Sequence, residues 1–174
     1  RIDLAFSFGT SPSIGTVKTS IESVGKGGLI REDGRLKTVS NAYRMKKIPF
    51  QNQPQWAVTI PWGDVFTSGI STGVPDGMVY MAMTKPSIYM LHVSNPFKGI
   101  MNTRFGQDLV KSLVSKFIKK GPDEQARETQ QGQFWGEAEA PGGDKVEMTM
   151  STPNVYSLTV EVGIRIARYC LGNH

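Results

Sequence analysis

The sequence predicts an α+β protein, in which helices pack on one face of a mostly antiparallel or mixed β-sheet. Segments with the two-residue period of strands outnumber segments with a helical period along the 174 residues. Most of the predicted strands are joined by hairpins, which favours antiparallel pairing. No internal repeat, low-complexity tract or long linker divides the chain. We therefore expect residues 1–174 to form a single domain.

The predicted strands follow the two-residue period or form short apolar runs. They cover residues 1–8, 28–31, 35–39, 43–48, 55–60, 78–83, 87–93, 133–140 and 145–151. The first strand alternates between apolar and polar side chains, which predicts one buried face. Residues 78–83 lack polar alternation, so this strand is expected to be buried on both faces. Asp33-Gly34 is a strong signal for a tight hairpin turn.

Helices are predicted where apolar side chains recur with a spacing of 3.6 residues. These segments are residues 14–24, 109–118 and 154–171. Ser11 is a candidate N-cap for the first helix, and Gly25 is expected to end it in the left-handed conformation. The last helix carries one apolar stripe, formed by Val155, Leu158, Val162 and Ile166. This stripe is expected to pack on an absent domain or on a second copy of the chain.

Composition argues against several classes of protein. No apolar run approaches the roughly 20 residues that a membrane span needs. Cys170 is the single cysteine, so a disulfide within the chain is impossible and a reducing, cytoplasmic compartment is expected. Only His92 and His174 accompany it, so no metal site is expected. His92 falls in a predicted apolar strand and is expected to be a core residue.

The charge of the chain is mildly positive, with a formal net charge of +5. Part of the excess comes from lysines in or near one predicted helix, Lys111, Lys116, Lys119 and Lys120. A solvated helix face explains such a pattern. No zinc-finger, RNA-recognition or helix-turn-helix signature accompanies it. Nucleic acid is therefore not expected as a partner.

The strongest functional signal lies in residues 60–80, which read IPWGDVFTSGISTGVPDGMVY. Such a segment is typical of a tight connection between strands and also of a ligand-binding loop. The candidate substrate-binding residues are Trp62, Gly63, Asp64, Thr67, Ser71, Thr72 and Gly73. Asp64 is the candidate for proton transfer, because a carboxylate in a partly closed cleft can be tuned for that work. Capping of the turn after Gly63 is its alternative role.

No complete catalytic set and no nucleotide-binding fingerprint is visible in the sequence. The glycines of Gly25-x-Gly27-Gly28 follow a predicted helix and precede a strand. This order is the reverse of what pyrophosphate binding at a helix N-terminus requires. A P-loop and a Gly-x-Ser-x-Gly elbow are also absent. The chain alone is therefore not expected to bind NAD or NADP.

Several short motifs follow one another along nearly the whole chain. They are Ser13-Ile14-Gly15-Thr16, GGLIREDG at residues 27–34, Pro61-Trp62-Gly63-Asp64, Ser71-Thr72-Gly73, Gly121-Pro122-Asp123-Glu124, Trp135-Gly136-Glu137 and Thr152-Pro153. In number and order they resemble the second, non-nucleotide-binding half of the saccharopine dehydrogenase-like NAD(P)-dependent oxidoreductases. One position departs from that family. Ile14 stands where the family usually has Arg, which puts an anion contact of that Arg in question.

The resemblance implies a division of labour between two domains. An N-terminal Rossmann domain, missing from this chain, would bind NAD or NADP. This chain would supply the face that binds a small-molecule substrate, and the sheet of a homodimer. Hydride transfer belongs to the cofactor, so none is expected from this chain alone. Related enzymes include amino-acid dehydrogenases and enoyl reductases of lipid assembly, and the sequence leaves both substrate classes open.

Two alternatives belong to other classes of function. The first is a non-catalytic module for ligand binding or protein interaction that keeps the same fold, which Ile14 favours. The second is binding of nucleic acid or a membrane surface through the lysine-bearing helix face.

Overall fold

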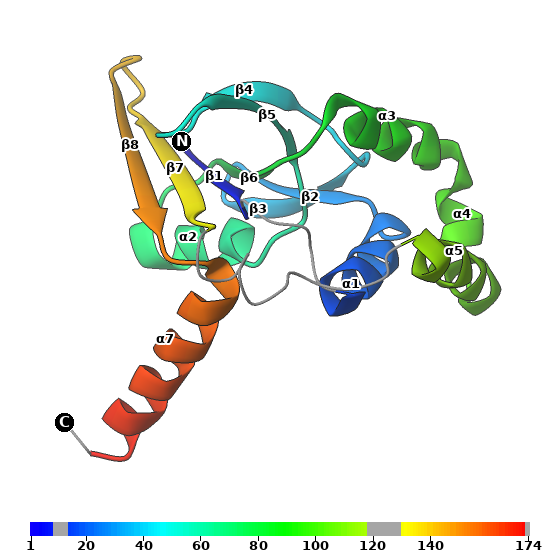
Figure 1. The fold of residues 1–174 in the computed structure, drawn as a ribbon. Coiled ribbons are helices and arrows are strands. Elements are labelled where there is room, and N and C mark those ends of the chain that lie inside the picture. The colour runs from blue at the N-terminus through cyan, green and yellow to red at the C-terminus, as the bar shows by residue number, and fades with distance from the viewer. Residues whose placement is uncertain (9–13, 118–129, 173–174) are drawn as a thin grey trace.

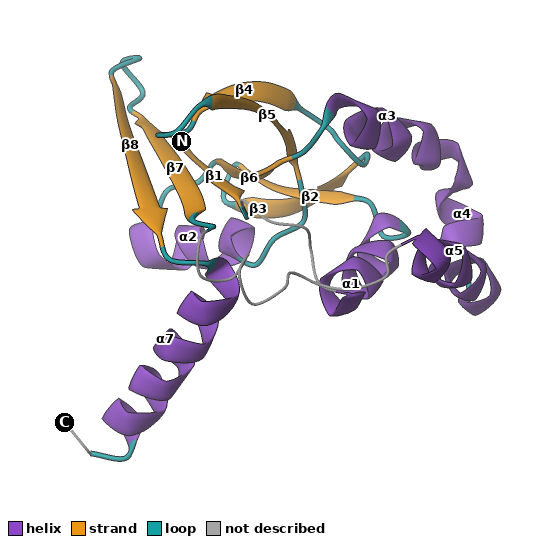
Figure 2. Ribbon diagram, viewed as in Figure 1, coloured by secondary structure: helices purple, strands orange, loops and turns teal. Residues whose placement is uncertain are grey.

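The computed structural model describes residues 1–8, 14–117 and 130–172, and it confirms the α+β class (Figures 1 and 2). The strands are β1 (Ile2–Ser7), β2 (Gly28–Glu32), β3 (Arg35–Val39), β4 (Met45–Pro49), β5 (Pro54–Thr59), β6 (Gly77–Ala82), β7 (Gly132–Glu139) and β8 (Lys145–Thr152). The helices are α1 (Ile14–Val24), α2 (Asp64–Thr72), α3 (Lys85–Ser94), the 3-10 helix η1 (Asn95–Phe97), α4 (Lys98–Met101), α5 (Arg104–Phe117) and α7 (Val155–Cys170).

The strands form one mixed, mostly antiparallel sheet. Strands β3, β2, β6, β1, β7 and β8 follow one another across it. β1 and β6 run parallel, with Ile2 opposite Gly77, whereas the other described pairs are antiparallel. β2 pairs with the start of β6 and β5 pairs with its end, on the side away from β1. The sheet therefore branches at β6, and β4 and β5 arch over the remaining strands (Figure 1).

The buried core consists of two layers, because successive side chains of a strand point to opposite faces. One layer contains Ala5, Ile30, Ile48, Phe50, Ala57, Met78, Tyr80 and Trp135, which come from strands and one loop. The other contains Phe6, Ala42, Val58, Ile60, Val65, Val79 and Ile88. Val65 belongs to α2 and Ile88 to α3. Within the described core, helical residues thus pack on one face of the sheet, as the sequence predicts.

Several local predictions are confirmed. Asp33 and Gly34 adopt positive φ angles of 51° and 73° at the turn between β2 and β3, as the hairpin signal requires. The hairpin of β7 and β8 and the helices α1, α5 and α7 are also present. β6 is buried along residues 77–80 on both faces. Ser11, the side chains of Lys111 and Lys116, and residues 118–129 lie outside the described part of the chain.

Two predictions in the first third are wrong in detail. β1 is buried on both faces, because Ala5 packs in one core layer and Phe6 in the other, and the side chains of Asp3 and Ser7 are buried as well. Gly25 does not adopt a positive φ angle; Gly27 does, at 89°. A Cβ atom at Gly25 would lie 2.8 Å from the carbonyl oxygen of Met101. Gly25 therefore allows a close contact between the end of α1 and α4.

Two segments that read as strand or loop are helices. Residues 87–93 belong to α3, whose N-cap Thr84 accepts a hydrogen bond from the Ser87 backbone N–H at 3.4 Å. Apolar side chains lie on both sides of this helix, which imitates the pattern of a buried strand. Residues 64–72 form α2, which ends at Gly73 with a left-handed φ of 71°. His92 is an exposed residue of α3 and not a core residue.

Candidate functional site

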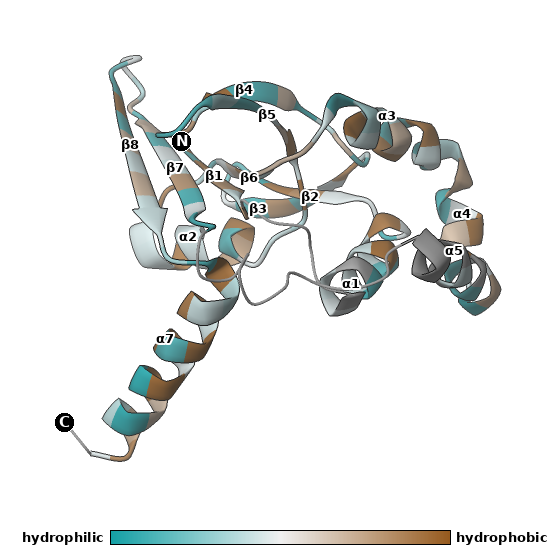
Figure 3. Ribbon diagram, viewed as in Figure 1, coloured by the Kyte–Doolittle hydropathy of each residue, from teal (hydrophilic) through white to brown (hydrophobic). Residues whose placement is uncertain are grey.

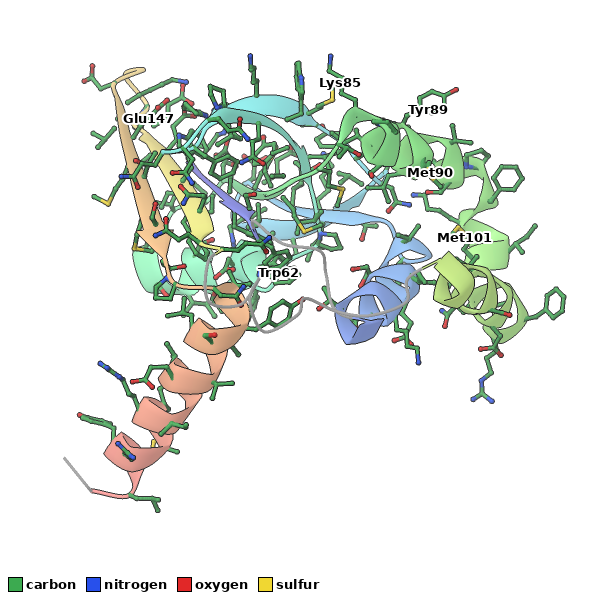
Figure 4. The ribbon with its side chains drawn as sticks, viewed as in Figure 1. Trp62, Lys85, Tyr89, Met90, Met101 and Glu147 are labelled. Atoms are coloured by element: carbon green, nitrogen blue, oxygen red, sulfur yellow. The ribbon has the colours of Figure 1, made fainter. Side chains whose placement is uncertain are left out.

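Two clefts lie on the face of the sheet that carries the helices, and Trp62 lines both of them. The first has a volume of about 410 Å³ and the second about 480 Å³. The Trp62 ring lies against Phe6 of β1, with 5.0 Å between the ring centroids. The side chain is 41% exposed, and it lies near the middle of the fold, below the sheet in Figure 4. Trp62 therefore forms a wall that the two clefts share.

The first cleft has one polar wall, provided by the hydroxyls of α1. These residues are Thr16, Thr19, Ser20 and Ser23, and their spacing places them on one face of the helix. The hydroxyls of Thr19, Ser20 and Ser23 donate to carbonyl oxygens of their own helix at 2.9–3.1 Å. Each hydroxyl oxygen can still accept a hydrogen bond from a ligand.

The remaining walls of the first cleft are mainly apolar. They come from β2, β6, α3 and the connections before α2, and include Ile60, Pro61, Trp62, Met81, Met83 and Leu91. No residue that lines the cleft within the described part of the chain has an ionisable side chain. A charged ligand would lose its hydration there without gaining a counter-charge. The geometry therefore suits a neutral, mostly apolar ligand with a hydrogen-bonding group facing α1.

The second cleft is lined by β1, β7, β8 and the first turns of α7. Its apolar lining includes Phe6, Phe8, Val79, Phe134, Met148, Met150 and Leu158. Asp64 is the ionisable residue in this lining. Asp64 begins α2 and is exposed, where a negative charge is favourable near the positive end of the helix dipole. A carboxylate there can meet a ligand without being buried.

The structure brings together part of the predicted site. Trp62 and Asp64 line the second cleft, and Gly63 lies between them in the chain. The other predicted residues lie along α2 or at its end and line neither cleft; they are Thr67, Ser71, Thr72 and Gly73. The Thr72 hydroxyl donates to the carbonyl oxygen of Ser68 at 2.7 Å, as exposed helical threonines commonly do. The contact of Thr67, Ser71, Thr72 and Gly73 with a ligand stays a prediction.

The sequence reasoning did not include the hydroxyl stripe of α1. The signal was present, because Thr16, Thr19, Ser20 and Ser23 recur at helical spacing opposite the apolar side of residues 14–24.

The hairpin motif at residues 27–34 joins the β2–β3 hairpin to α2. The Arg31 guanidinium donates to the carbonyl oxygens of Val65 and Phe66 in α2, at 3.2 and 3.0 Å. A third bond, at 3.0 Å, reaches the carbonyl oxygen of Gly34. Gly69 leaves room for the guanidinium, because a Cβ atom there would lie 2.2 Å from the Arg31 Cζ. This motif fixes α2, and therefore the position of Asp64, to the β2–β3 hairpin.

Ionisable residues in the opposite core layer also support the fold. Lys46 Nζ lies 3.1 Å from the Glu137 carboxylate and 4.3 Å from the centroid of the Trp135 ring. Burial raises the pKa of Glu137, but the hydrogen bond and charge of Lys46, with the charge of Lys145, outweigh it and lower that pKa. Burial, with the charge of Asp3, raises the pKa of Tyr80 to about 12.

No protein family matches the sequence, and no similar protein is found among curated proteins. Within the described residues, no group of three or more His, Cys, Asp or Glu side chains is placed to hold a metal ion. None of the described helices combines the length and the apolar character that crossing a membrane requires.

Proposed function

We propose that this chain is the substrate-binding and dimerisation half of a saccharopine dehydrogenase-like NAD(P)-dependent oxidoreductase. The order of short motifs from Ser13 to Pro153 supports the family. The observation that carries the binding role is the first cleft, with the α1 hydroxyls on one wall and apolar side chains on the others. A Rossmann domain of the parent protein would hold NAD or NADP, and the cofactor would supply the hydride chemistry.

The lining of the first cleft favours one of the two substrate classes. An amino acid is a zwitterion, and its carboxylate and ammonium groups need counter-charges or dense hydrogen bonding when they leave water. No ionisable side chain lines this cleft in the described chain. An enoyl or other neutral lipid substrate matches the cleft better, with its carbonyl toward the hydroxyls of α1. Asp64 lines the second cleft, on the far side of Trp62, so its candidate role in proton transfer applies to a group of the substrate that enters that second cleft.

Binding of a neutral probe tests this role directly. Methyl trans-2-decenoate, titrated into the chain, should cause a saturable change in tryptophan fluorescence, whereas lysine should cause none. Ser20→Phe should abolish the change, because it fills the cleft from the α1 wall. Ser71→Phe is the matched control, since Ser71 is exposed on α2 and lines neither cleft. Unchanged binding by Ser20→Phe would remove this cleft from consideration.

The cofactor assignment has its own test. Calorimetry with NADH and NADPH should give no measurable heat of binding for this chain alone. A micromolar dissociation constant would contradict the division of labour between the two halves.

The dimerisation role is supported by exposed apolar side chains at one end of the molecule. Val146, Met148 and Met150 are exposed on β8, which lies at an edge of the sheet. α7 projects from the body, and apolar residues recur along it, including Val162 and Ile166 (Figure 3). Two-fold self-association commonly covers such a surface. Light scattering should report about twice the monomer mass of 19.1 kDa, and Met148→Asp should return the chain to a monomer.

A further inference from the structure

A second apolar surface lies at the opposite end of the molecule, on α3, η1, α4 and α5 (Figure 1). We call it the arm face, and it consists of Tyr89, Met90, Val93, Phe97, Ile100 and Phe105. These side chains are between 47% and 77% exposed. Tyr89, Met90 and Val93 belong to α3, Phe97 to η1, Ile100 to α4 and Phe105 to α5, so the exposed apolar side chains continue over the successive short helices of this end. Figure 4 shows Tyr89 at the outer side of α3, away from the sheet.

The arm face is held outward by specific contacts. The Asn95 side chain accepts a hydrogen bond from the Asn41 backbone N–H at 2.8 Å and donates to the Asn41 carbonyl oxygen at 3.1 Å. The Asn41 amide group donates in turn to the Val24 carbonyl oxygen of α1 at 2.9 Å. Ile88 is buried on the inner side of α3. The exposed side chains are therefore the outer side of a packed segment, and their exposure does not come from loose packing.

The charges around the arm face are mostly positive. Residues 77–108 contain Lys85, Lys98 and Arg104 and one acid, Asp108, which is exposed on α5. Lys85 and Arg104 are exposed. None of the three cations takes part in an ion pair described for residues 1–8, 14–117 and 130–172. Lys85 Nζ lies 5.1 Å from the centroid of the Trp56 ring, which leaves its charge without a described counter-ion. A surface of exposed aromatic and aliphatic side chains with a net positive charge matches an anionic lipid surface, which offers both an apolar interior and negative headgroups.

The β8 and α7 end differs in charge. Its apolar side chains lie among residues of both signs, such as Lys145, Glu147 and the Glu161–Arg165 ion pair at 2.7 Å. Such mixed charge is typical of a surface that meets another protein, and Glu residues there would be repelled by anionic headgroups. The two ends therefore have different chemistry, and the arm face is the one that suits a lipid bilayer.

We propose that the arm face docks on the surface of an anionic membrane. Tyr89, Met90, Phe97 and Phe105 enter the boundary between headgroups and acyl chains, and the exposed Lys85 and Arg104 contact the headgroups. This docking does not depend on the proposed oxidoreductase role. It has one spatial consequence for the first cleft, because α3 lines that cleft with Leu91 and exposes Met90 on the arm face. The cleft then lies next to the membrane that holds its apolar ligand.

Vesicle flotation tests the proposal. The chain should float with phosphatidylcholine vesicles that contain about one-third phosphatidylserine at ~0.1 M salt, and much less with phosphatidylcholine alone. Lys85→Gln/Arg104→Gln should weaken binding about fivefold for each charge removed. Met90→Ser/Phe97→Ser/Phe105→Ser should weaken binding at least tenfold, because three apolar side chains no longer enter the bilayer. Since these side chains are exposed, circular dichroism and the melting temperature should stay near those of the wild type.

Phe66→Ser/Ile70→Ser on α2 is the matched control, because both side chains are exposed and lie outside the clefts and the proposed dimer contact, and it should bind vesicles like the wild type. Tyr89→Trp adds a positional readout, because its fluorescence should be quenched by brominated lipids in the bilayer. The proposal is overturned if the wild type does not bind the anionic vesicles, or if the triple arm variant binds as well as the wild type. It is also overturned if, in the absence of lipid, the wild type is an oligomer and the triple arm variant is a monomer. The arm face would then be a contact between copies of the chain.

Discussion

The contact between Arg31 and Gly69 gives a prediction whose size follows from the structure. A Gly69→Ala substitution would place Cβ 2.2 Å from the Arg31 Cζ, a distance that non-bonded atoms do not reach. The guanidinium must therefore swing away and lose its bonds to Val65, Phe66 and Gly34. At about 1 kcal/mol net for each bond, the loss is about 3 kcal/mol. Alanine in a helix recovers about 1 kcal/mol relative to glycine, which leaves a destabilisation of about 2 kcal/mol.

This loss should lower the melting temperature by roughly 4–8 °C for a chain of this size, as measured by circular dichroism. Gly163→Ala in α7 is the control, because a Cβ atom there meets no atom within 4 Å, and it should raise stability slightly. In the background of Arg31→Ala, the same Gly69→Ala change should cost nothing further, since the two residues act as one unit. A Gly69→Ala protein that melts at or above the wild-type temperature would refute the reasoning.

Three further predictions concern ionisable residues. Stability should fall as the pH rises from about 10 to 12, because the unfolded chain ionises the Tyr80 phenol before the folded chain does; urea titrations should show a decline of up to about 2 kcal/mol that Tyr80→Phe removes. Lys46→Met should cost about 1–2 kcal/mol at pH 7, because the Glu137 carboxylate loses its closest cation and keeps only the more distant Lys145, at 3.8 Å. That difference should shrink as the pH falls through the lowered pKa of Glu137, and a gap unaffected by pH would contradict this pairing. Asp64→Ala should change stability by less than about 1 kcal/mol, since Asp64 is exposed, but should reduce turnover if the full-length protein is the proposed oxidoreductase; unchanged kinetics would leave Asp64 as a residue of the helix end.

Local signals predicted much of the fold. The Asp33-Gly34 turn needed two positive φ angles, and residues with that tolerance stand there in the sequence. The buried β6 and the terminal helix followed from their apolar periods. By contrast, α3 was missed because Tyr89, Met90 and Val93 add apolar side chains to its exposed side. The signal for a helix was the pair Thr84 and Pro86, an N-cap residue and a first-turn proline. At the start of a helix these two residues are more informative than the spacing of apolar side chains.

Contacts between distant segments were beyond prediction from one sequence. Gly69 reads as a flexible loop residue until Arg31, far from it in the chain, is placed against it. The candidate site was likewise predicted only in part. Trp62 and Asp64 were predicted and do line a cleft, whereas the α1 wall depends on how α1 lies over the sheet. The resemblance to a dehydrogenase family rests on motif order, and the structure shows that the motif at residues 27–34 secures α2.

The shared wall at Trp62 makes the two clefts interdependent. A ligand in either cleft packs against the same indole ring, which rests on Phe6. Each occupant therefore restricts the ring rotamers that remain open to the other. Thermodynamic linkage requires the effect to be mutual, so a molecule in the second cleft changes affinity in the first by the same factor as the reverse. The binding free energy of both ligands together would then differ from the sum of the two free energies measured separately. Trp62→Ala should remove this difference.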